Sequence, residues 1–361
     1  MTMASAVGSG LDRLRSDAAA WDAFVEGSQT PFPLQLGAWA ESKASTGWRA
    51  VRVVADGGSG PIGGQLLMRR LGPGPWSLGY VPRGPVASRF DALSVAAFTE
   101  ALRTVAREHR LTHVTADPGL EGTDHHPLMA AAGWQPSAAL QPTTTQLIDL
   151  SKSEAELWSD VYKSSRRYAN GARRAGCTVR EGDEGDLEVF YDVLVETAQR
   201  SGFIPRALDA YRDVYRAFAA VGRAHLLIGS LPDGRPVSSK MILVSGPRAA
   251  QLYGGLTDAG GEARAGHLFE WEAIIRSKAA GAAVFDMWGR STAGIAHFKQ
   301  GFGGRVVEYG GTFDLVVHPA VHALFQRGRR AFVSLARRRR GLSTEPSDGI
   351  AAALQEGDES R

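Results

Sequence analysis

The stretch Pro-Ile-Gly-Gly-Gln-Leu-Leu-Met at residues 61–68 returns 175 positions later as Pro-Val-Ser-Ser-Lys-Met-Ile-Leu at residues 236–243. Both segments contain a proline, a β-branched residue, three small or polar residues and three apolar residues, in that order. Each follows a strand-like run and a turn, DGGSG before the first segment and PDGR before the second. Such turns between apolar runs are typical of β-hairpins. The spacing therefore predicts an internal duplication of the chain.

The two copies continue in the same order beyond these hairpins. A third strand and then a helix follow each hairpin, with the helices at residues 92–109 and 267–280. Each helix leads to a short strand that ends in aspartate, Asp117 in the first copy and Asp286 in the second. This order predicts mixed sheets flanked by helices. It is the element order of the N-acetyltransferase fold, so the predicted fold class is α/β (α+β) with two tandem acyltransferase domains.

The boundary between the copies is expected near residue 150. Residues 143–150 resemble a closing strand of the first copy, and a basic helix at 153–175 begins with a capping-box pattern. Seven arginines and no acid occur in residues 321–340, and the chain beyond them is rich in Ser, Gly and acids, which is typical of disorder. The predicted parts are a first domain, a second domain, a basic C-terminal segment and a disordered tail: residues 1–150, 151–316, 317–340 and 341–361.

Composition limits the compartment and the chemistry. The chain has 361 residues, a net charge of +3 and a single cysteine, Cys177, which excludes an internal disulfide and a cysteine-rich zinc site. The N-terminus lacks the basic and apolar regions of a signal peptide, and no apolar run approaches the roughly 20 residues that span a bilayer. We therefore predict a cytoplasmic protein, monomeric and without a metal, and leave open a peripheral contact with the inner membrane face.

The positive charge is concentrated in two places. One is the arginine-rich segment near the C-terminus, and the other is the acid-free stretch at residues 161–180. A cluster of basic residues attracts polyphosphates, either nucleic acid or an anionic membrane surface, and composition does not separate these two partners. The candidate contacts in the second stretch are Arg166, Arg167, Arg173 and Arg174.

Glycine-rich fingerprints of nucleotide binding are missing or incomplete. The chain has no GxxxxGK[ST] motif, so ATP binding by a P-loop has no support. N-acetyltransferases bind the pyrophosphate of coenzyme A at a glycine-rich helix N-terminus. Here that pattern is shortened at residues 264–268 and absent at residues 88–90. The sequence therefore predicts no coenzyme A site and no cofactor.

Several motifs, taken in order, closely resemble the Fem family of aminoacyl-tRNA-dependent peptidyltransferases. They run from the first domain into the second: QLGAWAESK (35–43), GW (47–48), YVPRGPV (80–86), RSGF (200–203), WEA (271–273), FDMWG (285–289) and FKQGFGG (298–304). The resemblance covers about residues 29 to 320. Members of this family add bridge residues to peptidoglycan precursors, and their two acyltransferase-like domains agree with the repeat found independently.

The resemblance implies the substrates and the domain arrangement. Aminoacyl-tRNA would be the co-substrate, and the acceptor would be a muramyl-pentapeptide precursor linked to a nucleotide or a lipid. The chain has no room for the coiled-coil arm of some members, so it is similar to the armless members. Their C-terminal segment packs back on the first domain, which is the arrangement we expect for the residues after about 317.

The resemblance also implies which residues contact the acceptor. Lys43 and Arg206 match positions that hold its sugar-nucleotide or pyrophosphate part. Tyr211 and Tyr253 match acceptor-contact positions, with the Arg206-to-Tyr211 spacing off by one residue. Arg83, within YVPRGPV, is grouped with them as a substrate-binding residue.

Two residues are expected to carry the chemistry. Lys299 matches a lysine near the reacting carbonyl, where an ammonium group can stabilise an oxyanion. Asp117 matches an acidic residue near the attacking amine, whose proton a carboxylate can accept or orient. An aminoacyl ester is already activated, so placement, a neutral amine and charge stabilisation are sufficient for transfer.

Two other functions stay open from the sequence. In the first, the same fold takes an acyl-coenzyme A and modifies a cell-envelope sugar or peptide, which the shortened loop at residues 264–268 disfavours. In the second, the chain is a non-catalytic protein that binds RNA or anionic lipid. That alternative predicts that Lys299 and Asp117 are dispensable.

Overall fold

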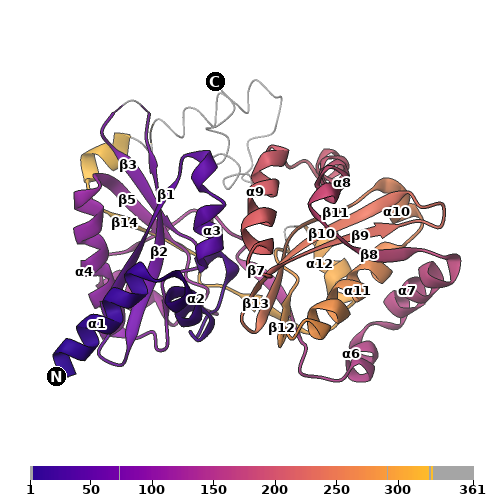
Figure 1. Cartoon of the computed structure of the whole chain (residues 1–361), viewed down its shortest axis with the longest axis horizontal. Helices are drawn as coiled ribbons and strands as arrows, with labels where there is room; N and C mark the ends of the chain where they lie inside the picture. The colour runs from indigo at the N-terminus through magenta and orange to yellow at the C-terminus, as the bar shows by residue number, and fades with distance from the viewer. Residues whose placement is uncertain (1–2, 73, 291, 325–326, 328–361) are drawn as a thin grey trace. The chain divides into compact units, whose positions relative to one another are not determined.

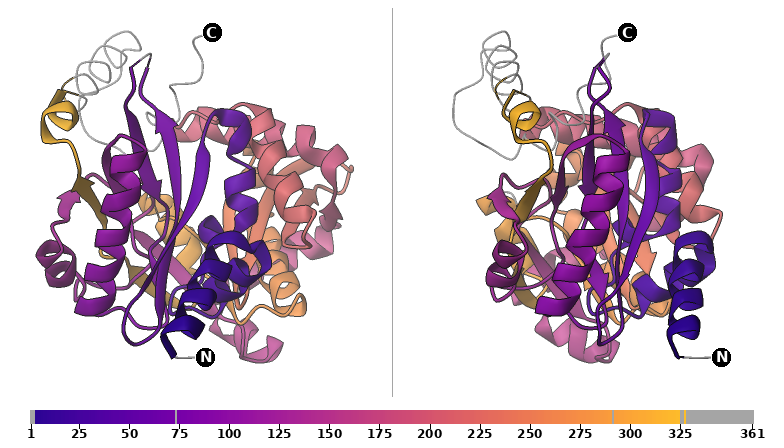
Figure 2. Two further views of the ribbon diagram at one scale, coloured as in Figure 1. Left: turned by 60° about the vertical axis from the view of Figure 1, so that its left-hand side comes forward. Right: turned by 90° about the vertical axis from the view of Figure 1, so that its left-hand side faces the viewer.

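A computed structural model of the chain describes residues 3–72, 74–290, 292–324 and 327. The chain divides into two compact units, the first formed by Met1–Thr143 with Tyr309–Arg361 and the second by Thr144–Glu308. Each unit contains one sheet flanked by helices (Figure 1, Figure 2).

In the first unit the strands are ordered β1-β2-β3-β5-β14-β6, and the short β4 pairs with β2. Neighbours are antiparallel except for β3 and β5, which run parallel. The strands are β1 (Arg49–Asp56), β2 (Pro61–Arg70), β3 (Ser77–Val81), β4 (Val86–Ala87), β5 (Leu111–Ala116), β6 (Gln135–Ser137) and β14 (Thr312–Val316).

The second sheet has the order β8-β9-β10-β11-β12-β7-β13. Again one neighbouring pair is parallel, here β11 and β12, and the others are antiparallel. The strands are β7 (Thr144–Asp149), β8 (Thr178–Gly182), β9 (Ala224–Ser230), β10 (Pro236–Ser245), β11 (Arg248–Leu256), β12 (Val284–Asp286) and β13 (Arg305–Glu308).

Helices cover both faces of each sheet. Those of the first unit are α1 (Met3–Ser16), α2 (Ala18–Glu26), α3 (Gly37–Glu41), α4 (Ala92–Glu108) and α5 (His126–Ala131). Those of the second unit are α6 (Glu154–Asp160), α7 (Lys163–Ala175), α8 (Leu187–Ser201), α9 (Leu208–Ala219), α10 (Asp258–Glu262), α11 (Gly266–Ala279) and α12 (Ala293–Gln300).

The predicted duplication is confirmed, and the structure explains the small residues of the repeat. Pro61 begins β2 and Pro236 begins β10, and each strand is the central one of an antiparallel three-stranded segment. Successive residues of a strand point to opposite faces. A Cβ atom at Gly63 would lie 2.9 Å from Trp21 of α2, and one at Gly64 would lie 3.0 Å from Phe98 of α4. Helices therefore pack closely on both faces of β2.

The domain bounds in the structure differ from those expected near residues 150 and 316, because the two copies exchange a strand. β7 precedes the second copy but was assigned to the first domain, and it pairs with β12 and β13. β14 falls within the expected second domain, yet it pairs with β5 and β6 of the first sheet. The two strands take equivalent places in their sheets. β7 lies beside β12, which ends at Asp286, and β14 lies beside β5, which ends just before Asp117. The division between the units therefore lies at residues 143/144 and 308/309.

The chain stays with the first unit directly after β14. The backbone N–H groups of Val317 and His318 both donate to the carbonyl of Thr112, the second residue of β5. Apart from residue 327, the arginine-rich part of the expected 317–340 segment lies outside the described residues, as does the expected disordered tail at 341–361.

The single basic helix expected at 153–175 is divided into α6 and α7. The break falls at Val161, whose φ and ψ of −67° and 132° are extended. Its side chain is buried in the core of the second unit, and the N–H of Tyr162 donates to Gly301 O at 2.9 Å. Burial of Val161 and this tertiary hydrogen bond replace the helical bonds that propensity alone would favour. The capping box at Ser153 and Glu156 is present as predicted.

Candidate active site

Asp117 lies at the end of β5 in the first unit and is 2% exposed. One carboxylate oxygen accepts a hydrogen bond from the backbone N–H of Arg83 at 2.8 Å. The other accepts from the hydroxyl of Tyr80 at 3.2 Å, and Gln141 donates to that hydroxyl at 3.0 Å. Burial raises the pKa of Asp117 to about 6, against the lowering effect of Arg83. The carboxylate is therefore mostly ionised at pH 7 and close to the pH range in which a base works.

Arg83 holds Asp117 through its backbone. Its φ of 52° is left-handed, a conformation that costs a non-glycine residue free energy and needs support from its surroundings. The side chain supplies that support, because its guanidinium donates to Pro142 O at 2.6 Å and lies 4.3 Å from the ring of Tyr309. The residue is only 2% exposed. The structure thus gives Arg83 a positioning role, and its direct contact with substrate stays a prediction.

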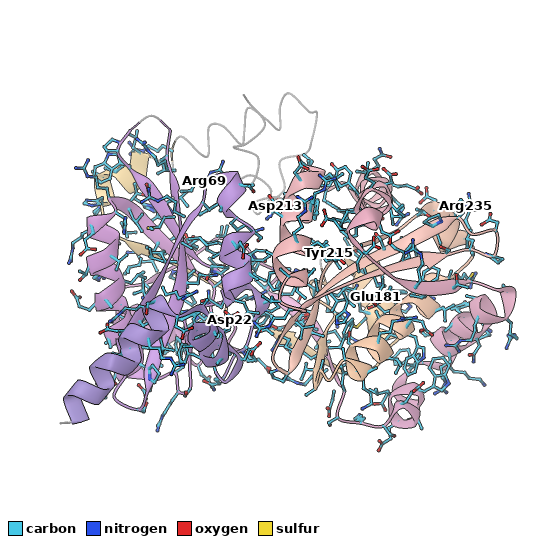
Figure 3. The ribbon with its side chains drawn as sticks, in the orientation of Figure 1. Asp22, Arg69, Glu181, Asp213, Tyr215 and Arg235 are labelled. Carbon is cyan, nitrogen blue, oxygen red and sulfur yellow. The ribbon has the colours of Figure 1, made fainter. Side chains whose placement is uncertain are left out.

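Lys43 follows α3 in the same unit and is also largely buried. Its ammonium lies 3.9 Å from the ring centroid of Trp39, a cation–π contact that stabilises the charge. α3 is fixed in turn by Asp22 of α2, labelled in Figure 3, which accepts from the N–H of Gly37 at 2.8 Å. The QLGAWAESK motif therefore forms a rigid support for Lys43.

Three predicted acceptor contacts come together in the second unit. The backbone N–H of Arg206 donates to the hydroxyl of Tyr211 at 3.2 Å, and the rings of Tyr211 and Tyr253 meet edge-on at 5.1 Å. Burial raises the pKa of Tyr211 to about 12 and also raises the pKa of Tyr253. Both hydroxyls are thus protonated at neutral pH and able to donate. The half-exposed Arg206 and the two tyrosines form a group that fits an anionic or sugar ligand.

Lys299, at the end of α12, is 9% exposed. Its Nζ donates to the carbonyls of Met287, Trp288 and Gly289 at 2.7, 3.0 and 2.5 Å. Burial lowers the pKa of Lys299 to about 8, so the ammonium form still dominates at pH 7. An ammonium has three N–H donors, and carbonyls accept from all three here. Direct donation to an oxyanion, which stays a prediction, would require one of these bonds to be given up.

Two residues of β7 hold the segments around Lys299, and the sequence analysis did not identify them. Gln146 donates to Lys299 O at 2.7 Å and to Gly303 O at 2.5 Å, and its own carbonyl accepts from Arg290 at 3.0 Å. Thr145 donates to Asp286 at 2.5 Å. Both residues belong to a polar run, Thr144 to Gln146, at the start of the strand, and nothing in that run distinguishes them.

The glycines of FKQGFGG are required for close packing of the backbone. Gly303 and Gly304 have left-handed φ values of 74° and 77°. A Cβ atom at Gly304 would lie 2.3 Å from Leu147 O. Packing of Gly304 against β7 and of Gly303 against Asp160, the last residue of α6, therefore explains these two glycines without a ligand. A cavity of about 590 Å³ adjoins them on the β7 side, next to Asp149 and Arg305.

We expect Gly304→Ala to lower the free energy of unfolding by about 2–4 kcal/mol, from the left-handed backbone and the clash with Leu147 together. Gly234→Ala is the matched control, because Gly234 also has a left-handed φ, 85°, but no atom would lie within 4 Å of the new Cβ. Denaturant unfolding of both variants measures the difference. Equal losses of stability would show that the approach to Leu147 is unimportant.

The chain itself occupies the helix N-terminus of the first unit that corresponds to a coenzyme A site, and it uses several N–H groups just before the corresponding helix of the second unit. At α4 the carboxylate of Asp91 accepts from the N–H of Ser94 at 3.0 Å, so a negative charge already occupies that end. Before α11 the N–H groups of Ala263, Arg264 and Ala265 donate to carbonyls of residues 259–261. Pyrophosphate binding needs free N–H groups at such an end.

The basic helix α7 presents only part of its charge to solvent. Arg166 donates to the carbonyls of Trp158 and Ser159 at 3.0 and 2.9 Å and thereby caps α6. Arg167 and Arg173 are exposed, although Arg173 lies 3.3 Å from the carboxylate of Glu272. Arg174 is exposed as well. Three of the four predicted phosphate contacts are thus on the surface.

In the part of the chain that the structure describes, no three His, Cys, Asp or Glu side chains are grouped to hold a metal ion. Among the same residues, no helix is both long and apolar enough to cross a bilayer. Of the predicted site residues, Lys43, Arg83 and Asp117 belong to the first unit. Arg206, Tyr211, Tyr253 and Lys299 belong to the second.

Comparison with known proteins supports the acyltransferase fold. Residues 159–300 match the family model of the acetyltransferase (GNAT) domain. The chain is 29% identical over 223 residues to the "Lipid II:glycine glycyltransferase" of Staphylococcus aureus strain MRSA252, which covers 58% of this chain and 53% of that protein. The chain thus spans about half the length of the curated relatives it matches.

Solved structures show the same architecture. The crystal structure of FemX superposes with a TM-score of 0.75 at 21% identity, covering 84% of this chain and 96% of that one. The structure of L-PGS from Bacillus licheniformis gives a TM-score of 0.50 at 13% identity, covering 87% and 97%. The fold is GNAT-like. The predicted fold class is therefore confirmed.

Proposed function

We propose that the protein is an aminoacyltransferase that moves an amino acid from aminoacyl-tRNA to the stem-peptide amine of a peptidoglycan precursor. One observation supports the choice of donor: the acyltransferase fold is present, yet Asp91 occupies the N-terminus of α4 and the N–H groups just before α11 bond to the chain itself. This arrangement favours a donor without the pyrophosphate of coenzyme A. The similarity to a lipid II glycyltransferase supports a peptidoglycan precursor as the acceptor.

The reaction needs few groups from the protein. The acceptor amine attacks the aminoacyl carbonyl, an amide bond forms, and the ester bond to the tRNA ribose breaks. The amine must lose a proton, and we assign that proton to Asp117, whose pKa of about 6 leaves a carboxylate available at pH 7. The ribose oxygen leaves as a hydroxyl by taking up the proton that the amine has lost. Lys299 supplies positive charge for the tetrahedral intermediate.

Binding of each substrate is assigned to separate groups. We assign the anionic part of the acceptor to Lys43 and to the Arg206–Tyr211–Tyr253 group. The tRNA phosphates are assigned to the exposed arginines of α7, and a membrane surface is the competing partner for these arginines. If the arginines of α7 contact the tRNA phosphates, the affinity for tRNA should fall as the salt concentration rises.

We expect Arg206→Ala to weaken binding of a muramyl-pentapeptide nucleotide by about 1.5–3 kcal/mol, the usual contribution of a charge-assisted hydrogen bond. Arg235→Ala is the control, because Arg235 is an exposed residue of the β9–β10 turn, labelled in Figure 3, with only a 4.0 Å contact to Asp233. Isothermal titration calorimetry measures both. Unchanged affinity for the Arg206 variant would remove this residue from the acceptor site.

The donor is tested by measuring tRNA binding against salt concentration. For single-stranded and duplex nucleic acid, the logarithm of the affinity falls with a slope of about −0.7 to −0.9 per phosphate contacted. Neutralising Arg167 and Arg174 together should reduce the magnitude of that slope by about 1.4–1.8. A slope near zero for the unaltered protein would contradict a tRNA donor. Salt-dependent binding to anionic vesicles, without binding to tRNA, would assign these arginines to a membrane.

A further inference from the structure

The second unit contains a buried ion pair that the proposed mechanism does not use. Lys240 of β10 and Glu270 of α11 are 8% and 1% exposed, and Lys240 Nζ lies 2.5 Å from Glu270 Oε2. The other carboxylate oxygen, Oε1, is buried and has no hydrogen-bond partner among the described residues. A buried polar atom is nearly always hydrogen-bonded, and one left without a partner costs stability. Glu270 therefore lacks one donor.

This ion pair lies where the sheet opens. β11 and β12 pair only over Arg248–Ala250 and Val284–Asp286, although β11 continues to Leu256. Lys240 pairs with Gly254, in the part of β11 that no longer pairs with β12. Lys299 belongs to the same surroundings, because the neighbouring Phe298 of α12 packs on His267 of α11, three residues before Glu270, with ring centroids 5.0 Å apart. The charges of Glu270 and Lys240 also act on the pKa of Lys299. A carboxylate with a free acceptor thus lies near the lysine assigned to the reacting carbonyl.

We propose that Glu270 Oε1 receives the α-ammonium group of the aminoacyl donor. The proposal rests on the proposed function. A carboxylate accepts hydrogen bonds but cannot donate them, so the missing partner must be a donor, and a cation is favoured beside a negative charge. Lys240 neutralises Glu270 through the other oxygen. The carboxylate would then bridge two ammonium groups.

The reaction itself distinguishes between the two amines that could occupy this place. The acceptor amine must lose its proton to attack, and the proposed mechanism gives that proton to Asp117 of the first unit, whereas the carboxylate of Glu270 is already paired with Lys240. The α-ammonium of the donor stays protonated throughout the transfer. It is also attached to the carbon next to the reacting carbonyl, which agrees with a site near Lys299. Glu270 is thus a specificity-determining residue that selects aminoacyl over simple acyl donors.

The test compares one tRNA carrying either a free or an N-acetylated amino acid, since acetylation removes the positive charge. For the unaltered protein we expect kcat/KM to be about 10- to 100-fold higher with the free amino acid, the range for one charge-assisted hydrogen bond. Glu270→Gln keeps the shape and removes the charge, so the ratio should fall to within about threefold of one. Glu184→Gln, which removes an exposed carboxylate paired with Arg216, is the control.

Each outcome decides the proposal. An unaltered protein that uses both donors equally overturns it, as does a folded Glu270→Gln variant that keeps the full ratio. If the single variant does not fold because Lys240 is left without its partner, the double variant Lys240→Met, Glu270→Gln replaces it, and the same ratio is measured. Transfer from neither tRNA by the unaltered protein would instead contradict the proposed function.

Discussion

Lys299→Met is expected to lower the turnover number by about 10²-fold or more, the effect of losing one oxyanion-stabilising group. Methionine keeps the length of the apolar stem but removes the charge and the three bonds to the carbonyls of residues 287–289. The negative charge on the carbonyl oxygen develops only during the reaction and is absent from the bound donor, so donor affinity should change little. Single-turnover kinetics with saturating aminoacyl-tRNA measures the chemical step directly.

Lys278→Met is the matched control for this variant. Lys278 lies on α11 of the same unit, and its Nζ also donates to a carbonyl, that of Leu150 at 2.7 Å. Its loss should leave the transfer rate within about twofold. Near-normal transfer by Lys299→Met would give Lys299 a purely structural role and would remove it from the proposed mechanism.

Asp117→Asn is expected to lower kcat/KM by about 10²-fold and to remove a break near pH 6 from the pH profile. Burial raises the pKa of this carboxyl to about 6. Below that pH the carboxyl is protonated and cannot accept the proton of the amine, so activity falls as the pH decreases through 6. The acceptor amine contributes its own rise with pH to both proteins, and the diagnostic result is the additional break.

Asp56→Asn serves as the control, because Asp56 is an exposed residue at the end of β1 that accepts from the N–H of Gly58. The profile of this control should keep the break near pH 6. An Asp117 variant with the same break and nearly the same rate would show that another group removes the proton. The measurement is kcat/KM from pH 5 to pH 8 at constant ionic strength.

The sequence predicted the duplicated fold because the repeat is a consequence of packing. Small residues at 63–64 allow helices to approach both faces of β2, and β10 has small residues at the corresponding positions 238–239. Because both copies must satisfy the same packing constraints, similar residues recur 175 positions apart. The hairpins, the third strands and the helices that follow were therefore predictable.

The strand exchange was not predictable in the same way. β7 and β14 are short strands rich in Thr, Leu, Ile and Phe, and nothing in either strand indicates which sheet it joins. The order of the chain favours pairing of each strand with the elements just before it. In the structure, β7 instead pairs with the later strand β12, and β14 pairs with β5 of the first sheet. The break at Val161 has the same origin, because tertiary burial overrides a favourable local pattern.

Contacts between side chains that are distant in the sequence were the least predictable part of the candidate site. Lys240 and Glu270 are separated by 30 positions, and Gln146 and Lys299 by 153. No local spacing connects such pairs. By contrast, Arg206 and Tyr211 are only five positions apart and are in direct hydrogen-bond contact.

The central claim concerns the acyl donor, and one transfer assay tests it most directly. A set of radiolabelled aminoacyl-tRNAs and radiolabelled acetyl-coenzyme A would each be incubated with the protein and a muramyl-pentapeptide, and the labelled peptide product would be separated and counted. We expect transfer from at least one aminoacyl-tRNA, abolished by Lys299→Met, and no transfer from acetyl-coenzyme A. Label transferred from acetyl-coenzyme A and from none of the tRNAs would contradict the account.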